Sequence, residues 1–147
     1  METKNILCPV DFSENSEFAL AYASALAKES GGTLHLLYVI EHQPVTDTGF
    51  AGYTWEPVDV EAVQKELGQV MSPDAAVARE DHVVSGDPAS RIVEFAEDNA
   101  IDMVVIGTHG RTGLARLLMG SVAEAVVRRA PCPVITVKQP VPEKQAQ

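Results

Sequence analysis

The chain has 147 residues, of which 46% are hydrophobic, and this length and composition suit one domain with a buried core. A formal net charge of −10 argues against nucleic acid as a partner, because the overall field repels its backbone. The polar N-terminus precedes an apolar stretch too short for a signal peptide or a membrane span, so we expect a cytoplasmic protein without membrane contact.

The first third of the chain predicts a strand, a helix and a second strand. The apolar run of residues 5–10 predicts a buried strand. A helix follows it, with Ser13 or Asn15 as its cap. Residues 33–39 show little alternation and predict another strand that is buried on both faces. The apolar face of the helix is expected to consist of Phe18, Tyr22, Ala25 and Leu26.

Residues 41–58 have neither a helical nor a strand period, as is typical of a long loop. Three aromatic residues lie in it, Phe50, Tyr53 and Trp55. We favour the interpretation that they pack the loop onto the body of the protein, because single apolar residues in loops are ordinary. The alternative is a lid or a contact with a partner.

Residues 59–71 return to helical spacing, and a third strand is expected within residues 75–84. Arg79, Glu80 and Asp81 place consecutive charges in that strand. Charges of this kind protect an exposed sheet edge from pairing with other chains, so we expect an edge strand.

The last part of the chain predicts two helices and two strands. Asp87-Pro88 is a strong helix start, because a cap residue is followed by proline at the first helical position. Asn99 can close that helix. The remaining elements are a strand at residues 103–106, a helix from Ser121 and a strand at residues 134–137.

Five strands that alternate with four helices predict an α/β fold with a parallel sheet covered on both faces. We expect one domain over residues 1–138 and a disordered tail over residues 139–147. Cys8 and Cys132 are expected to stay unpaired, as in a reducing compartment. His35 is expected to be a core or edge histidine.

The segment from residue 101 to residue 138 carries the strongest chemical signal. Its glycines follow the spacing Gly107-x2-Gly110-x9-Gly120-Ser121, between a buried strand and a helix. Glycines let backbone N–H groups approach a ligand, and a helix N-terminus attracts anions, so the pattern predicts a phosphate site. Ser121 is expected at the N-cap, where its hydroxyl can bond the N–H of Glu124 or a phosphate oxygen. The segment is also locally basic, through Arg111, Arg116, Arg128, Arg129 and Lys138.

Over this segment and residues 6–13, the sequence resembles the ATP-binding branch of the universal stress protein family, whose pattern is G-x2-G-x9-G-[S/T]. The resemblance implies a Rossmann-like, doubly wound sheet with strand order 3-2-1-4-5. It also implies a homodimer in which residues 134–137 pair with their copy. The sequence of that strand agrees, because it is an uncharged, β-branched edge that needs to be covered.

The resemblance implies the following contacts to bound ATP. Pro9, Val10 and Asp11 lie against the adenosine, with Asp11 near the ribose, although on the residues alone Asp11 is as well explained as a helix cap. Val39 offers backbone groups to the adenine. Mg²⁺ or Mn²⁺ is expected to be held through the phosphates. The phosphate contacts are expected from Gly107, Gly110, Gly120, Ser121 and Val122, with His109 and Arg111 as secondary candidates.

We therefore expect a regulatory ATP-binding protein that hydrolyses ATP slowly at most, with no catalytic residue and no protein metal ligand assigned. The main alternative is a dimeric interaction module that has kept the fold and lost the nucleotide. An adenylating enzyme or a flavodoxin-like carrier is disfavoured, because both want a phosphate loop directly after the first strand. This chain has the acidic stretch Pro9-Val10-Asp11-Phe12-Ser13-Glu14 there.

Overall fold

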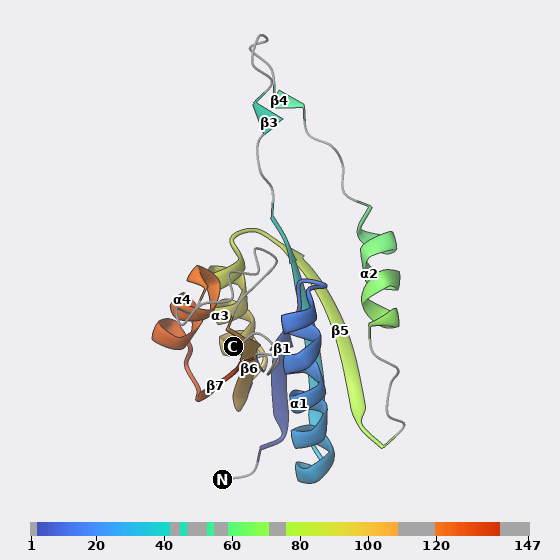
Figure 1. Ribbon diagram of the computed structural model, residues 1–147, viewed down its shortest axis with the longest axis vertical. Coiled ribbons are helices and arrows are strands. Elements are labelled where there is room, and N and C mark those ends of the chain that lie inside the picture. The colour runs from blue at the N-terminus through green and yellow to red at the C-terminus, as the bar shows by residue number, and fades with distance from the viewer. Residues whose placement is uncertain are drawn as a thin grey trace, which may run out of the picture.

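The computed structural model describes residues 3–41, 45–46, 53–54, 59–70, 76–108 and 120–138 (Figure 1). In chain order the elements are β1 (Asn5–Pro9), α1 (Glu14–Ser30), β2 (Thr33–Ile40), β3 (Val45–Thr46), β4 (Tyr53–Thr54), α2 (Val60–Gln69), β5 (Ala78–Ser85), α3 (Pro88–Asp98), β6 (Met103–Gly107), α4 (Ser121–Arg129) and β7 (Val134–Val137).

Five of these strands form one parallel sheet in the order β5-β2-β1-β6-β7. Counted along the chain, this is the expected order 3-2-1-4-5, so the predicted fold is confirmed. The order reverses between β1 and β6, which pair side by side, and ligands of open α/β sheets bind outside the carboxyl ends of the strands at such a point. The charged strand β5 lies at one edge, as predicted, and β7 lies at the other.

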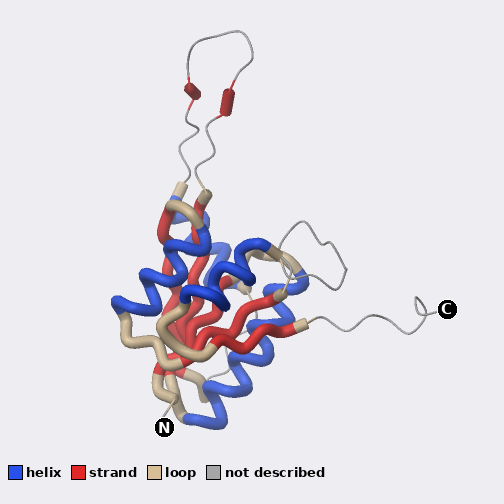
Figure 2. Tube along the Cα trace, turned by 90° about the vertical axis from the view of Figure 1, so that its left-hand side faces the viewer, coloured by secondary structure: helices blue, strands red, loops and turns tan. Residues whose placement is uncertain are grey.

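Helices cover both faces of the sheet (Figure 2). On one face, α1 and α2 enclose a core that includes Leu20 and Leu67, both fully buried. On the other face, α3 and α4 pack together over a core that includes Ile92 and Val126. Side chains of β1 enter both cores, because Leu7 points to one and Ile6 to the other, which explains its continuously apolar sequence.

The predicted apolar face of α1 was wrong. Phe18 is 42% exposed and Tyr22 is 48% exposed, whereas the buried face consists mainly of small residues. Small side chains let the helix backbone approach the sheet closely, so the largest apolar residues of this helix mark its outer side. Leu26 is partly buried at the margin of the core. The residues buried on α1 are Asn15, Ser16, Ala19, Leu20, Ala23 and Ala27.

The stretch from residue 41 to residue 58 contains two short strands that the sequence did not predict. β3 and β4 pair antiparallel, with Val45 opposite Thr54, and form a separate two-stranded sheet. The expected packing of Phe50 and Trp55 concerns residues outside those described, as does the expected tail over residues 139–147.

Cys8 and Cys132 are both free, as predicted; Cys8 lies in β1, Cys132 lies just before β7, and β6 separates these two strands. Burial raises the pKa of Cys8 to about 12, which keeps this thiol protonated. His35 is buried, and burial is the main cause that lowers its pKa, with Glu80 opposing and His82 adding to the shift. Within the described residues, none of the helices is long and apolar enough to cross a membrane.

Candidate functional site

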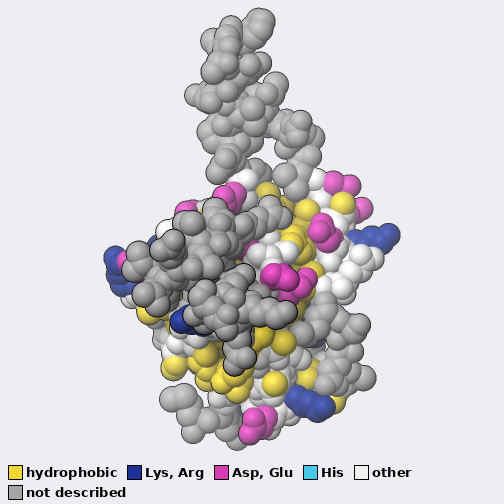
Figure 3. All heavy atoms as spheres, in the orientation of Figure 1, with side chains coloured by type: hydrophobic (Ala, Val, Ile, Leu, Met, Phe, Trp, Pro, Cys, Tyr) yellow, Lys and Arg dark blue, Asp and Glu magenta, His cyan; other side chains and the backbone are white. Residues whose placement is uncertain are grey.

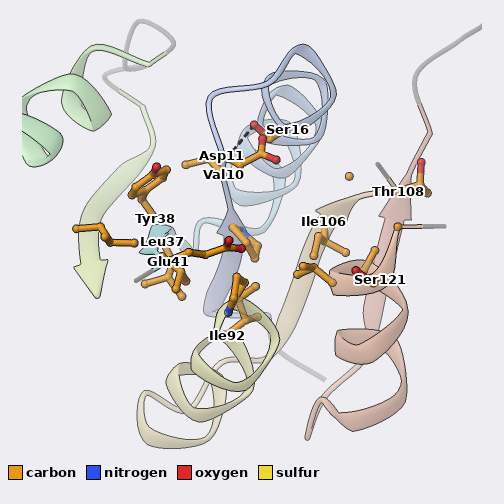
Figure 4. Close-up of a pocket in the computed structure, with 18 of the residues that line it drawn as sticks. Val10, Asp11, Ser16, Leu37, Tyr38, Glu41, Ile92, Ile106, Thr108 and Ser121 are labelled. Carbon is orange, nitrogen blue, oxygen red and sulfur yellow. Dashed lines mark hydrogen bonds between the residues drawn. The ribbon is translucent and has the colours of Figure 1, made fainter. Parts of the chain in front are cut away.

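A cleft of about 750 Å³ opens at the carboxyl ends of β1, β2 and β6, where the strand order reverses. This volume is in the range of small-molecule sites. Figure 4 shows Asp11 and Ser16 near the start of α1, Tyr38 and Glu41 at the end of β2, and Ser121 in the first turn of α4. The first turn of α4 and the start of α3 contribute further walls.

The cleft brings together eight of the eleven residues that the sequence singled out. The other three, His109, Gly110 and Arg111, lie outside the described residues. The eight come from four separate parts of the chain, and the strand order of the sheet brings these parts together. They are Pro9, Val10, Asp11, Val39, Gly107, Gly120, Ser121 and Val122.

Asp11 organises the turn between β1 and α1. Its carboxylate accepts hydrogen bonds from the backbone N–H and the hydroxyl of Ser13, and Ser13 in turn caps α1 by accepting from the N–H of Ser16 at 3.1 Å. The N–H of Asp11 donates to the hydroxyl of Ser16 at 3.2 Å. Asp11 is therefore a support of the cap residue and not the cap itself, and it stays half-buried at the mouth of the cleft.

Phe12, between Asp11 and Ser13, has a φ of 65°. This left-handed conformation costs a non-glycine residue about 1–3 kcal/mol, and such strain gathers at functional sites. The ring of Phe12 packs on that of Tyr38, with centroids 4.7 Å apart. The strained turn is thus anchored to the end of β2, which carries the next wall of the cleft.

The end of β2 presents backbone groups to the cleft. The N–H of Val10 donates to the carbonyl of Leu37 at 2.9 Å, so Leu37 turns its carbonyl toward β1. Backbone groups of a strand alternate in direction, and Val39 therefore turns its N–H and C=O to the same side. Because β1 ends at Pro9, the partner of Leu37, these groups of Val39 face the cleft beyond the end of that strand.

Gly107 ends β6 where α1 passes very closely. A Cβ at Gly107 would lie 2.2 Å from Oδ1 of Asn15, which is 7% exposed. One residue later, the carbonyl of Thr108 accepts a hydrogen bond from the N–H of Gly120 at 2.6 Å. This bond joins the two ends of the segment between β6 and α4 and holds the start of α4 against the end of β6.

The first turn of α4 points its N-terminus at the cleft, because Gly120, Ser121 and Val122 all line it. The structure corrects the predicted cap. Gly120 occupies the N-cap position, its carbonyl accepts from the N–H of Glu124 at 3.0 Å, and as a glycine it has no side chain with which to cap the helix. Ser121 is the first helical residue and is exposed. A helix that starts without a side-chain cap leaves its first N–H groups available to a ligand.

Arg128 and Arg129 do not contribute to this anion site. They lie in the last turn of α4, about 10 Å along the helix axis from Ser121. Arg128 pairs with Glu124 on the surface, and Arg129 lies 3.4 Å from the hydroxyl of Ser90. The predicted basic character of this segment therefore does not reach the cleft through these two residues, and Arg111 and Arg116 lie outside the described residues.

The charged residues among the described lining are Asp11 and Glu41, both acidic. On the face that Figure 3 shows, the lysine and arginine side chains of the described residues are separated from one another. The described residues of that face thus form no continuous basic stripe of the kind that follows a nucleic-acid backbone.

Sequence reasoning missed several residues of the cleft. Tyr38 and Glu41 flank the predicted Val39 contact, and their position at the carboxyl end of a parallel strand was an available signal. Thr108 follows the first glycine of the motif and is 8% exposed. Pro88 and Ile92 come from α3, whose distance from the cleft depends on packing across the sheet and has no local sequence signal.

Comparison with known proteins gives a consistent result. The sequence profile of the universal stress protein family matches residues 2–138 of this chain. Universal stress protein MJ0531 of Methanocaldococcus jannaschii is 39% identical over 145 residues, which cover 95% of this chain and 85% of the relative. Universal stress protein MJ0577 of the same organism is 32% identical over 157 residues, with 92% and 95% covered.

Solved structures agree with these relatives. A structure of protein MJ0577 matches with a TM-score of 0.70 and 28% identity, over 97% of this chain and 100% of that one. A universal stress protein in complex with cAMP matches with a TM-score of 0.66 and 25% identity, over 93% and 98%. From the family match and the identity of these relatives, the chain belongs to the universal stress protein family.

Proposed function

We propose that this chain is a regulatory ATP-binding protein and that the cleft at the strand-order reversal holds the nucleotide. The observation that carries the proposal is the meeting of two backbone surfaces in one cleft. The first turn of α4, whose N-cap is a glycine, and the carboxyl end of β2 both line the same cleft of about 750 Å³. The first surface suits phosphate and the second suits the edge of a base.

Val39 and Asp11 are the proposed adenosine contacts. The N–H and C=O of Val39 would bond the adenine edge, while Val10 and Ile92 provide apolar walls for its faces. Asp11, held by Ser13, would accept a hydrogen bond from a ribose hydroxyl, since a carboxylate accepts strongly from O–H donors. The complex of a relative with cAMP supports an adenine nucleotide as the ligand class.

Gly120, Ser121 and Val122 are the proposed phosphate contacts, together with His109, Gly110 and Arg111 of the glycine motif. The N–H groups of the first turn of α4 would donate to phosphate oxygens, and the Ser121 hydroxyl adds one more donor. Asp11 and Glu41 add negative charge to that of ATP, so a divalent cation, Mg²⁺ or Mn²⁺, is expected to accompany the phosphates.

The proposed output is a signal to a protein partner, with hydrolysis that is slow at most. Bound ATP supplies a charged group at the surface of the cleft, and its presence or absence is the signal that such a partner would read. The free thiols of Cys8 and Cys132 support a cytoplasmic setting, and the position of the uncharged strand β7 at the sheet edge supports a homodimer.

Two variants test the site by calorimetric titration with ATP and Mg²⁺. Gly120 has a φ of −63° and a ψ of 158°, which other residues adopt without strain, so Gly120→Val keeps the backbone and adds bulk at the proposed phosphate contact. We expect it to weaken binding about a hundredfold. Ser121→Ala removes one charge-assisted hydrogen bond and should weaken binding about tenfold.

Val127→Ala is the matched control, because Val127 is exposed on the same helix and does not line the cleft. It should bind ATP as the unmodified chain does. Equal ATP affinities for the unmodified chain and Gly120→Val would show that the start of α4 does not contact the nucleotide. Absence of binding in every protein would favour the dimeric interaction module instead.

A further inference from the structure

A second cluster of functional side chains lies on the same sheet, toward the amino ends of the strands and away from the cleft. It consists of His35 on β2 with Glu80 and His82 on β5. His35 precedes Val39 by four residues, or about 13 Å along the strand. We propose that these three side chains form a binding site for one divalent transition-metal ion, with Zn²⁺ as the preferred occupant.

The register of the sheet brings the three side chains to one face. His35 lies directly opposite Glu80 across the β2–β5 ladder, and His82 follows Glu80 by two residues, so all three point the same way. That face is the one covered by α3, because the ring of Phe95 packs 4.7 Å from that of His82 and 6.1 Å from that of His35. The ligand atoms of the cluster lie within 4.8 Å of one another.

The two imidazoles are spaced as metal ligands are. Nδ1 of His35 and Nε2 of His82 are 3.2 Å apart. Tetrahedral zinc with Zn–N bonds of about 2.0–2.1 Å requires two nitrogens about 3.3 Å from each other. The separation of the two nitrogens therefore suits the ion, and binding requires the rings to turn so that both lone pairs converge on it, with release of the proton between them.

Asn5 gives His35 the tautomer that binding needs. Its Oδ1 lies 3.0 Å from Nε2 of His35, so it accepts the proton of that nitrogen and leaves the lone pair on Nδ1. Ligating histidines in metal sites commonly donate their other N–H to an oxygen in this way, which fixes the ring. Asn5 is thus a positioning residue.

Glu80 supplies the third ligand and most of the charge. It is exposed, so its carboxylate can turn toward the two nitrogens by rotation of its own side chain. Two imidazoles and one carboxylate are a donor set typical of zinc, with a fourth position open to water. The ion would tie the edge strand β5 to β2 on the face of α3.

Zinc binding to nucleotide-free protein tests the site, by calorimetry with ZnCl₂ and by visible absorption of the protein loaded with Co²⁺ alone. The unmodified chain should bind one Zn²⁺, and Co²⁺ should give the intense absorption of a tetrahedral site. His82→Gln and Glu80→Gln are suitable variants, because neither residue is fully buried. Each should weaken zinc binding at least about a hundredfold, and Asn5→Ala about 10–100-fold.

Glu66→Gln is the control, because Glu66 is an exposed carboxylate on α2 and is not part of the cluster. It should leave zinc affinity unchanged, and all variants should keep their circular dichroism spectra. His82→Gln should also keep the ATP affinity of the parent chain, which separates this site from the cleft. Unchanged zinc affinity in His82→Gln, or no saturable binding by the unmodified chain, would overturn the proposal.

Discussion

Gly107 and Asn15 meet where β6 ends against the first turn of α1. The contact leaves no room for a side chain on residue 107, since a Cβ would stand 2.2 Å from Oδ1 and 3.1 Å from the carbonyl oxygen of Asn15. Asn15 is buried, so its side chain has little room to move away from an added Cβ. The first glycine of the motif is therefore required by the packing of α1 on β6, whatever the cleft binds.

Gly107→Ala should lower the free energy of unfolding by about 1–3 kcal/mol, because overpacking forces neighbouring groups to shift. Urea denaturation measures this change. Gly68→Ala is the matched control: Gly68 lies in α2, and its nearest neighbour in space would be 3.8 Å from the added Cβ. It should stabilise the protein by about 0.5–1 kcal/mol through helix propensity. A loss at Gly68 as large as that at Gly107 would contradict the packing argument.

At the scale of single elements, α3 shows how a cap supports the cleft from a distance. The carboxylate of Asp87 accepts from the N–H of Ser90 at 3.0 Å and so fixes the start of the helix that carries Pro88 and Ile92 into the cleft. The backbone hydrogen bond from Ser90 is the main cause that lowers the pKa of Asp87 below its usual value near 3.8. The cap therefore works in its ionised form.

Asp87→Ala should cost about 1 kcal/mol of stability at neutral pH, as is typical of a lost cap. Because the pKa of Asp87 is lowered by folding, its ionised form adds stability above pH 3.8, and this part is lost as the pH falls through the lowered value. The difference between the parent chain and Asp87→Ala should thus shrink in urea titrations below about pH 4. Asp98→Ala, at the other end of α3, should show no such cost, and an equal loss there would contradict the capping role.

The elements differ in how well the sequence predicts them. The strands β1, β2, β6 and β7 were predictable because they are apolar runs, as parallel strands in a covered sheet require, and β5 was predictable as an edge strand from its charges. Helix α3 was predictable because Asp87-Pro88 is a strong start signal. The buried face of α1 was not, since the packing distance selects small residues and leaves Phe18 and Tyr22 outside. The pairing of β3 with β4 rests on two residues in each strand, too few to show a period.

The candidate site was predictable to the extent that it is local in the chain. Gly107, Gly120 and Ser121 follow from the spacing of the motif, and Asp11 from its place after a strand. The cap was misplaced by one residue, because glycine and serine are both acceptable N-cap residues and only the hydrogen bond from Glu124 to Gly120 distinguishes them. Ile92 depends on how α3 crosses the sheet, which no local pattern records.

At the scale of the whole molecule, the two edges of the sheet differ in how well their sequences prevent pairing with another chain. β5 carries charges, whereas β7 is Val134-Ile135-Thr136-Val137 and uncharged. The carbonyls of Pro133 and Val137 accept from the N–H groups of Val104 and Thr108, so the backbone groups of odd-numbered residues on β7 face the sheet. By alternation Val134 and Thr136 turn their backbone N–H and C=O groups outward. This edge of the described sheet is the surface we propose for the homodimer.

Thr136→Pro should convert the proposed dimer to a monomer, because it removes an outward N–H without removing a bond to β6. Light scattering after size-exclusion chromatography should give about twice 15.8 kDa for the parent chain and 15.8 kDa for the variant. Thr136→Val, which keeps the N–H, should remain a dimer. A parent chain that is monomeric at all concentrations would rule out β7 as the interface.

The most direct test of the central claim is to look for nucleotide in the protein and then to restore it. Purified protein is denatured, the supernatant is analysed by ion-exchange chromatography, and stripped protein is titrated with ATP and Mg²⁺ by calorimetry. We expect released adenine nucleotide, or saturable binding near one ATP per chain with a dissociation constant in the micromolar range. Absence of both signals would contradict ATP binding by the cleft. The protein would then be better explained as a dimeric interaction module that does not use a nucleotide.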